Sequence, residues 1–429
     1  MQLRLVGKKS RVAALITAVA LGSSCLGLLS QAASAAPVTL TFWSRPQGED
    51  GGIIKLMIDE FNRTHTDVQA KLTIIPQEQF VQKVATAYRS GDAPDITSVD
   101  LIYVPYFAKA GAFEDVTSIY NSAKYKNQWS RAHVALSMYK NKMYSLPFTA
   151  EGSVLFWNKD LFKKAGLNPE AAPKTMAEIL SAAKKISALG DDIKGYYFSG
   201  ACSGCNIFTF APYIWAQGGD VLNKDGSPNF ASKQAKVALQ FYKDLWDAGT
   251  VPASAKNDNG SSFAAPFLTG KVGMVGAGAF FIPGLVKDHP EINFGVTPLP
   301  GAKAGQSSSF AGGDNIAVLK GTKHPKEARD FLAWATDKGQ EFLAKQPVLP
   351  TRLDVAQKVY VPLDPVNYKV MYDALLVGKT PWTTSYNSLI QDNQGPWLKM
   401  FTGAIFGGNV DAAQKAAQAQ ALKIYKKEK

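Results

Sequence analysis

Segments with strand-like and helix-like patterns alternate along almost the whole of this 429-residue chain. Residues 38–43 (VTLTFW) alternate apolar and polar side chains and are rich in β-formers, as expected for a half-buried strand. Residues 53–62 carry apolar side chains at helical spacing, and residues 68–75 and 95–99 are again typical of strands. Strands that alternate with helices require a sheet with helices on its faces, so the sequence predicts an α/β fold.

The second half of the chain continues this alternation. Its length suits two or three domains, and 46% apolar residues are enough to build their cores. No fixed-period repeat interrupts the pattern. Further strands are expected at residues 153–157, 272–275, 294–299 and 316–319, and further helices at residues 79–89, 160–165, 176–189, 234–248, 325–344 and 411–425.

The first 35 residues have the pattern of an export signal. Four basic residues precede an uncharged apolar stretch at residues 12–29, and Ala33-Ser34-Ala35 offers a small-residue cleavage site. We expect cleavage after Ala35 and a periplasmic protein. A membrane anchor, or a lipid on Cys25, is the less favoured alternative, because small polar residues interrupt the apolar stretch and Cys25 lacks the usual preceding leucine.

Cysteine and histidine are scarce, with 3 and 4 copies, so neither a disulfide scaffold nor a metal site is expected. Cys202 and Cys205 are separated by two residues, and in an exported protein this spacing favours a local disulfide. Free thiols and a redox function remain alternatives. All four histidines lie in polar, turn-like surroundings and are expected at the surface: His65, His133, His289 and His324.

Sequence motifs of the common enzyme classes are missing. The chain has no phosphate-binding loop, no dinucleotide-binding glycine pattern, no serine-nucleophile elbow and no zinc-protease motif. The net charge is +12, but the basic residues are spread along the chain, so nucleic-acid binding is not expected. We expect neither a cofactor nor an enzyme, although a hidden pair of glycosidase carboxylates stays open.

Seven segments in a fixed order resemble one family. Together they resemble the extracellular solute-binding proteins of ABC importers, and in particular the carbohydrate-binding branch that includes maltose-binding protein. The resemblance covers nearly all of residues 38–425, and it is carried by FNRTH (61–65), SGDAPDI (90–96), YSLP with VLFWNKDLF (144–147 and 154–162), FLTGKVGM (267–274), GGD (312–314), EARDFL (327–332) and LPTR (349–352).

This resemblance implies a type II periplasmic-binding-protein fold, in which a multi-strand hinge joins two α/β lobes and the ligand lies between them. The N-terminal lobe would be residues 37–149 plus 303–346, and the C-terminal lobe 150–302 plus 347–429. By analogy, we expect a monomer that binds a sugar, namely a di- or oligosaccharide or a glycoside. Lobe closure would then deliver the sugar to the membrane-spanning permease subunits of an ABC importer.

In the N-terminal half, five residues are candidate ligand contacts. Trp43 ends the first strand, at the edge where clefts open in α/β sheets. Asp100 has the same position after the third strand. The resemblance implies polar sugar contacts from Arg45 and Glu49, in the loop after the first strand, and from Glu151 in the expected hinge segment.

In the C-terminal half, the resemblance implies aromatic stacking on the sugar from Phe208, Phe280 and Trp382. Small residues before Phe280 would leave room for a ligand. Gly313 and Asp314 match a family loop that faces the cleft, and glycine there would permit close approach of the backbone.

Three alternatives are kept. The solute could be a phosphorylated compound such as glycerol phosphate, or a polyamine, since the sequence contains both basic and acidic candidates. A secreted glycoside hydrolase is the alternative from a different functional class.

Overall fold

The computed structural model describes residues 36–46, 52–346 and 348–429, and Pro37–Lys429 form one unit by their contacts. The expected export signal and Glu49 lie outside the described residues. The strands are β1 (Val38–Ser44), β2 (Val68–Ile74), β3 (Ile96–Asp100), β4 (Met138–Tyr139), β5 (Lys142–Met143), β6 (Leu146–Asn158), β7 (Met274–Gly278), β8 (Phe294–Pro300), β9 (Ser307–Ser308), β10 (Ala311–Val318) and β11 (Leu349–Pro350).

Helices separate most of these strands along the chain. They are α1 (Gly52–Thr64), α2 (Gln77–Ser90), α3 (Val104–Lys109), α4 (Thr117–Ser122), α5 (Arg131–Ser137), α6 (Lys159–Lys164), α7 (Met176–Ser187), α8 (Ser203–Thr209), α9 (Ala211–Trp215), α10 (Lys233–Asp247), α11 (Phe281–Asp288), α12 (Pro325–Ala335), α13 (Lys338–Leu343), α14 (Leu353–Val355), α15 (Asn367–Val377), α16 (Pro396–Ile405) and α17 (Val410–Glu428).

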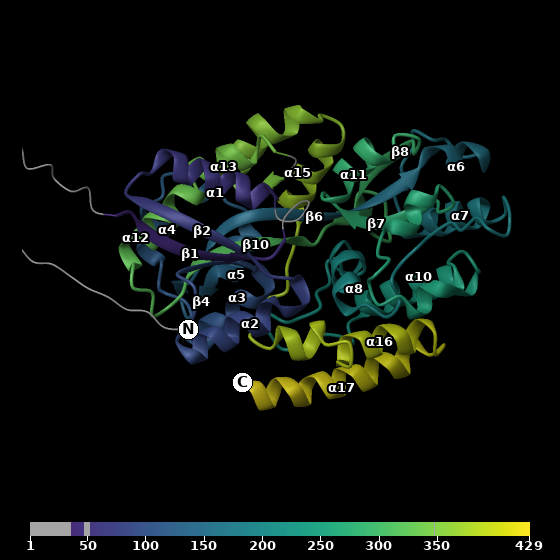
Figure 1. The fold of residues 1–429 in the computed structure, drawn as a ribbon. Helices are drawn as coiled ribbons and strands as arrows, with labels where there is room; N and C mark the ends of the chain where they lie inside the picture. The colour runs from purple at the N-terminus through teal and green to yellow at the C-terminus, as the bar shows by residue number, and fades with distance from the viewer. Residues whose placement is uncertain (1–35, 47–51, 347) are drawn as a thin grey trace, which may run out of the picture. The chain divides into compact units, whose positions relative to one another are not determined.

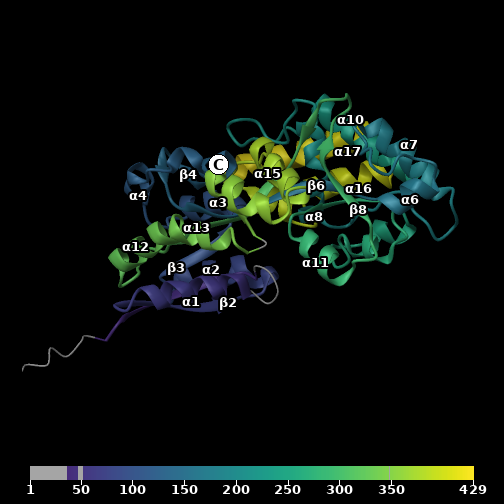
Figure 2. The ribbon, with the colours of Figure 1, turned by 90° about the horizontal axis from the view of Figure 1, so that it is seen from above.

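The main sheet has the strand order β2-β1-β3-β10-β6-β8-β9, and β7 and β11 also pair with β6. Strands β2 and β3 lie parallel to β1, whereas β10 runs antiparallel to β3 and β6. The first half of β6 pairs with β10 as far as Gly152, and its second half pairs with β7 and β8 from Ser153 onward. Strand β6 is therefore shared by two parts of the sheet, which lie toward its two ends in Figure 1 and Figure 2.

One apolar core lies between the first part of the sheet and the helices α1 and α12. Phe42 of β1 is fully buried, with its ring 5.7 Å from that of Phe331 in α12. Phe331 also meets Phe61 of α1 at 4.6 Å. These contacts explain the helical spacing of apolar residues in α1, because its buried face is the one that packs against the strand.

A polar cluster is buried where the paired strands β6 and β10 pack against α5. His133 of α5 is fully buried, with its Nδ1 2.8 Å from Ser130 Oγ and its Nε2 3.0 Å from the Thr149 carbonyl oxygen. Asn315 of β10 donates to the His133 carbonyl oxygen and to Ser137 Oγ. The prediction of a surface position was therefore wrong for His133, because the polar neighbours that suggested a surface form a hydrogen-bonded core instead.

The long helix expected at residues 325–344 is broken in two. Helix α12 ends at Ala335 and α13 begins at Lys338. Between them, Thr336 turns its hydroxyl back to the Leu332 carbonyl oxygen, and Asp337 pairs with Arg352 at 2.6 Å. The break is fixed by a partner outside the helical segment, so the local apolar pattern could not reveal it.

Candidate functional site

A cavity of about 1250 Å³ opens where the two parts of the sheet meet. Its lining comes from the loops after β1 and β3, from β6 and β10, and from α1, α8 and α11. Because β1 and β3 are parallel, their carboxyl ends bring Arg45 and Asp100 to the same edge. The lining residues used below are Arg45, Gln77, Asp100, Tyr103, Glu151, Gly204, Ile207, Phe208, Phe280, Phe310, Gly313, Tyr386 and Gln391.

Arg45 is the centre of the charged wall of this cavity. Its Nε donates to Asp314 Oδ1 at 2.6 Å, and its Nη2 forms a second, shorter contact with the same carboxylate. Asp100 lies 3.7 Å from Nη2, and Nη1 donates to Gln77 Oε1 at 3.0 Å. Burial acts to lower the pKa of Arg45, but Asp314 and Asp100 raise it above its ordinary value, so the guanidinium stays charged.

Asp314 lies beneath this wall and does not line the cavity. The residue is fully buried, accepts a hydrogen bond from Ser98 Oγ at 2.6 Å, and its own N–H donates to Thr149 Oγ1. The neighbouring Gly313 does line the cavity, with φ +112° and the position of a Cβ atom overlapping the Thr149 carbonyl oxygen. Only glycine fits there, and a β-bulge follows between Asp314 and Asn315.

Two carboxyl groups of the cavity hold their protons unusually tightly. Burial raises the pKa of Asp100 to about 6, with Arg45 opposing the shift. Burial also raises the pKa of Glu151 to about 8, although the backbone N–H of Phe280 and the charge of Arg45 lower it. Among the described residues Glu151 Oε2 has no hydrogen-bond partner. The cavity thus presents a buried acceptor that a ligand hydroxyl could satisfy.

Another part of the cavity lining is aromatic. Phe208 lies 6.4 Å from Phe280 and 5.5 Å from Phe310, measured between ring centroids. Phe280 is 51% exposed, although it lines a cavity, so its ring is available for contact. A Cβ atom on Gly278 would come within 2.6 Å of Phe280 and 3.0 Å of Phe208, which explains the small residue at this place.

Tyr103 and Tyr386 close another part of the lining, with ring centroids 6.3 Å apart in an edge-to-face arrangement. Tyr386 is 1% exposed, and its hydroxyl has no partner within the part of the chain described here. Burial raises the pKa of Tyr386 well above its ordinary value, and the nearby Asp100 adds to the shift. The Tyr386 hydroxyl therefore remains a neutral donor near the Asp100 carboxyl group.

Six of the residues proposed from sequence line this one cavity: Arg45, Asp100, Glu151, Phe208, Phe280 and Gly313. Sequence reasoning missed Gln77, Tyr103, Phe310, Tyr386 and Gln391. Tyr103 was within reach of the sequence, since it follows Asp100 by three residues. Tyr386 follows the candidate Trp382 by four residues, and no local signal separated the two.

Trp43 and Trp382 do not line the cavity. In β1 the buried residues Phe42 and Ser44 flank Trp43, so the tryptophan points to the opposite face, where Lys83 Nζ lies 5.8 Å from the ring centroid. The indole N–H of Trp382 donates to the Met138 carbonyl oxygen at 3.1 Å. Both rings have other contacts here, and a role for them in ligand binding stays a prediction.

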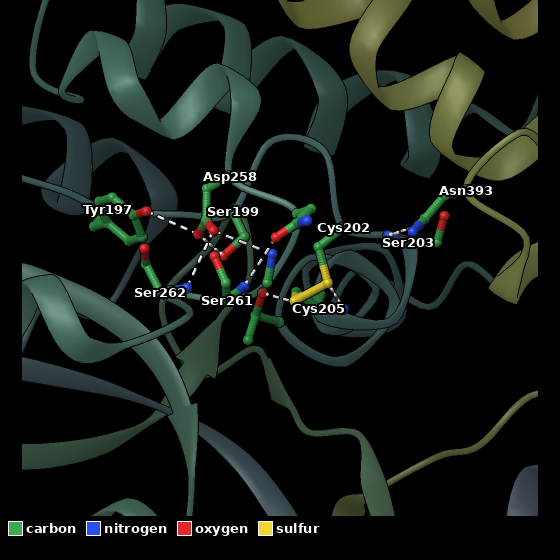
Figure 3. The surroundings of a disulfide bond; sticks show 12 residues. Tyr197, Ser199, Cys202, Ser203, Cys205, Asp258, Ser261, Ser262 and Asn393 are labelled. Atoms are coloured by element: carbon green, nitrogen blue, oxygen red, sulfur yellow. Dashed lines mark hydrogen bonds between the residues drawn. A yellow bond between two sulfur atoms is a disulfide. The ribbon is translucent and has the colours of Figure 1, made fainter. Parts of the chain in front are cut away.

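Cys202 and Cys205 are joined by a disulfide at the start of α8 (Figure 3). Across residues 36–46, 52–346 and 348–429, no cluster of three or more His, Cys, Asp or Glu side chains is arranged to hold a metal ion. Within the same ranges, no helix combines the length and apolar character needed to cross a membrane.

A family described as bacterial extracellular solute-binding protein matches residues 45–342. Two curated relatives match over most of their length. The sn-glycerol-3-phosphate-binding periplasmic protein of Pectobacterium atrosepticum is 28% identical over 347 residues, which cover 76% of this chain and 74% of the relative. The diacetylchitobiose binding protein of Streptomyces coelicolor is 27% identical over 299 residues, which cover 67% of each chain.

The fold is also similar to a solved structure, the GacH receptor of Streptomyces glaucescens, which was determined unliganded and with acarbose. The TM-score is 0.78 at 24% identity, and the match covers 91% of this chain and 99% of that one. At this identity the likeness concerns the fold, and it confirms the two-lobe α/β architecture of the periplasmic-binding-protein class that the sequence predicted.

Proposed function

The chain belongs to the bacterial extracellular solute-binding proteins, since the family match spans more than half of its length, and on that premise we propose that it binds a di- or oligosaccharide in the cavity. The observation that carries the proposal is the contrast between the two walls. The lining combines the aromatic rings of Phe208 and Phe280 with the polar side chains of Arg45, Asp100 and Glu151. A sugar has the same two-sided character, with apolar C–H faces and a rim of hydroxyls.

The polar wall suits hydroxyls better than a phosphate. Arg45 is the cation closest to the buried carboxyl groups, and it is already paired with Asp314 and Asp100. A phosphate bound to Arg45 would have to displace these partners and would lie beside Glu151 as well. A neutral hydroxyl can instead donate to Glu151 Oε2 or Asp100 and accept from Tyr386 without displacing any of them. A name that refers to glycerol phosphate in one relative therefore does not decide the ligand here.

A role in transport is proposed because residues from both proposed lobes line the cavity. We propose lobes of residues 37–149 plus 303–346 and 150–302 plus 347–429, with a monomer acting outside the cytoplasmic membrane. A sugar that contacts both lobes favours a closed arrangement by its differential affinity for it. The membrane-spanning permease subunits of an ABC importer would recognise the closed, loaded form, and the sugar would be released without chemical change.

A calorimetric screen tests the proposal. Maltose, mannobiose and N,N′-diacetylchitobiose are titrated into the protein beside sn-glycerol 3-phosphate and putrescine, and reducing ends are assayed after prolonged incubation. We expect at least one sugar to bind and to be recovered intact. Binding of the phosphate or the amine alone would replace the sugar by that solute, and release of new reducing ends would identify a hydrolase.

A further inference from the structure

The disulfide lies in the wall of the cavity. Cys202 caps α8, where its Sγ accepts a hydrogen bond from the Cys205 N–H at 3.0 Å, and the Cys202–Cys205 bond closes the first turn of this helix. Gly204, between the two cysteines, lines the cavity, as do Ile207 and Phe208 further along α8. The bond therefore fixes the turn from which this part of the wall begins.

A second segment is built around the two sulfur atoms. Gly260 has φ +100°, and a Cβ atom placed on it would lie 2.8 Å from Cys202 Sγ and 2.9 Å from Cys205 Sγ. The Gly260 backbone thus packs directly against the disulfide, with no room for any side chain.

The buried Asp258 carboxylate anchors this segment (Figure 3). It accepts hydrogen bonds from the hydroxyls of Tyr197 at 2.8 Å and Ser199 at 2.6 Å, and from the backbone N–H groups of Gly260 and Ser262. The support of the disulfide is therefore itself held in one conformation, and it can transmit this order to the start of α8.

A third segment ties the same turn to the other end of the lining. The Ser203 N–H donates to Asn393 Oδ1 at 3.0 Å, and the Ser203 hydroxyl donates to the Asp392 carbonyl oxygen at 3.3 Å. Gln391, the residue before this pair, lines the cavity, and its amide would meet any side chain placed on Gly204. Movement of the first turn of α8 would consequently displace lining residues from two segments.

We propose that the Cys202–Cys205 disulfide is a positioning element of the ligand cavity, so that its reduction weakens sugar binding while the fold is retained. The inference rests on the proposed function. A bridge across a sequence separation of 3 closes a very short loop, and the entropic stabilisation by a disulfide increases with loop length. The main consequence of this bond is therefore local, at the turn that it closes.

Reduction by a dithiol breaks the S–S bond between Cys202 and Cys205. The S–S bond accepts two electrons and two protons and gives two thiols, while the dithiol loses the same electrons and protons and forms its own disulfide. The two Cys Sγ atoms then separate to van der Waals distance, while the Gly260 backbone is packed against both of them. The first turn of α8 has to rearrange to accommodate them.

The test measures affinity and stability in parallel. Calorimetry with maltose, mannobiose and N,N′-diacetylchitobiose is run on the oxidised protein and after treatment with dithiothreitol, and far-UV circular dichroism follows thermal unfolding in both states. We expect the Kd of the bound sugar to rise by about fivefold or more on reduction, with the helical signal unchanged at the temperature of titration. An unchanged Kd overturns the inference, and so does loss of the folded signal, which would make the bond a global staple.

Matched variants separate the bond from the reagent. The double variant Cys202→Ser/Cys205→Ser should bind as weakly as the reduced protein and should not respond to dithiothreitol. Tighter binding by this variant than by the reduced protein, or a response to the reagent, contradicts the inference. If the oxidised protein binds none of the three sugars, the proposed function fails and this inference with it, whereas strong binding in both redox states removes the inference alone.

Discussion

The two walls of the cavity are held in place by different forces. On the charged wall, Arg45 is fixed by Asp314, which in turn accepts from Ser98 and is positioned by Thr149. On the aromatic wall, Phe280 is half exposed, with Phe208 as an aromatic neighbour at 6.4 Å. The charged wall belongs to the buried structure of the paired strands β6 and β10. Because the Phe280 ring is half exposed, changes to it should affect affinity far more than stability.

The largest expected effect comes from the base of the charged wall. Asp314→Ala leaves the partly buried Arg45 without its main partner, which should lower the free energy of unfolding by about 3 kcal/mol. Asp330→Ala is the matched control, because it removes a carboxylate from the exposed pair with Lys326 and should change stability by less than about 1 kcal/mol. Urea unfolding measures both, and equal losses would show that the Arg45–Asp314 pair is not part of the supporting structure.

Acid should weaken the same region through His133. Burial lowers the pKa of this imidazole to about 4, from 6.5 in an unfolded chain. Below pH 6.5 the unfolded chain binds the proton first, so the stability contributed by the neutral imidazole is lost as the pH falls toward 4, by up to about 3 kcal/mol. Urea unfolding at several pH values should show a steeper decline for the wild type than for His133→Gln. Parallel curves would contradict this assignment.

On the aromatic wall, Phe280→Ala should weaken sugar binding by about tenfold, or 1.4 kcal/mol, with little change in unfolding. The exposed ring contributes contact area to the ligand and little to the core. Val286→Ala provides the control, since Val286 lies on α11, is 56% exposed and does not line the cavity. Calorimetry that finds equal affinities for the two variants would remove Phe280 from the site.

The smallest effect concerns the proton on Glu151, whose pKa burial raises to about 8. A ligand hydroxyl donates more strongly to the carboxylate than to the acid, so wild-type affinity should rise by about threefold between pH 6 and pH 9. Glu151→Gln should reduce this dependence and leave the part that comes from Asp100, whose pKa is about 6.

In the unliganded protein, ionisation of Glu151 has the opposite effect, because it lowers the stability of the fold. The folded pKa of Glu151 exceeds the unfolded value of 4.5, so its stability contribution is present at low pH and is lost as the pH rises through 8. Glu151→Gln should therefore remove part of the loss of stability between pH 6 and pH 9. A titration of the variant that keeps the wild-type slope would assign the proton to another group.

The sequence predicted the parts of this fold that depend on local pattern. The alternation in residues 38–43 and the helical spacing in residues 53–62 correspond to β1 and α1, and the chain order of such segments predicts the α/β class. The break between α12 and α13 was not predicted, because it depends on the contact of Asp337 with Arg352. The buried position of His133 likewise depends on strands that lie far along the chain.

The same distinction applies to the cavity. Arg45, Asp100 and Phe280 line it because they follow the ends of β1, β3 and β7, positions that a sequence pattern can indicate. Trp382 does not line it, because its indole is hydrogen bonded to Met138, a contact between segments far apart in the chain. Tyr386 was missed for the corresponding reason, since only the fold brings it to Tyr103 and Asp100.

Small-angle scattering, with and without a sugar at a concentration that calorimetry shows to be saturating, tests most directly whether one ligand draws both walls together. We predict a smaller radius of gyration for the loaded wild-type protein than for the unliganded one. For Phe280→Ala at a sugar concentration far below its Kd, we predict that the curves with and without sugar superimpose. Identical wild-type profiles with and without saturating sugar would contradict the account.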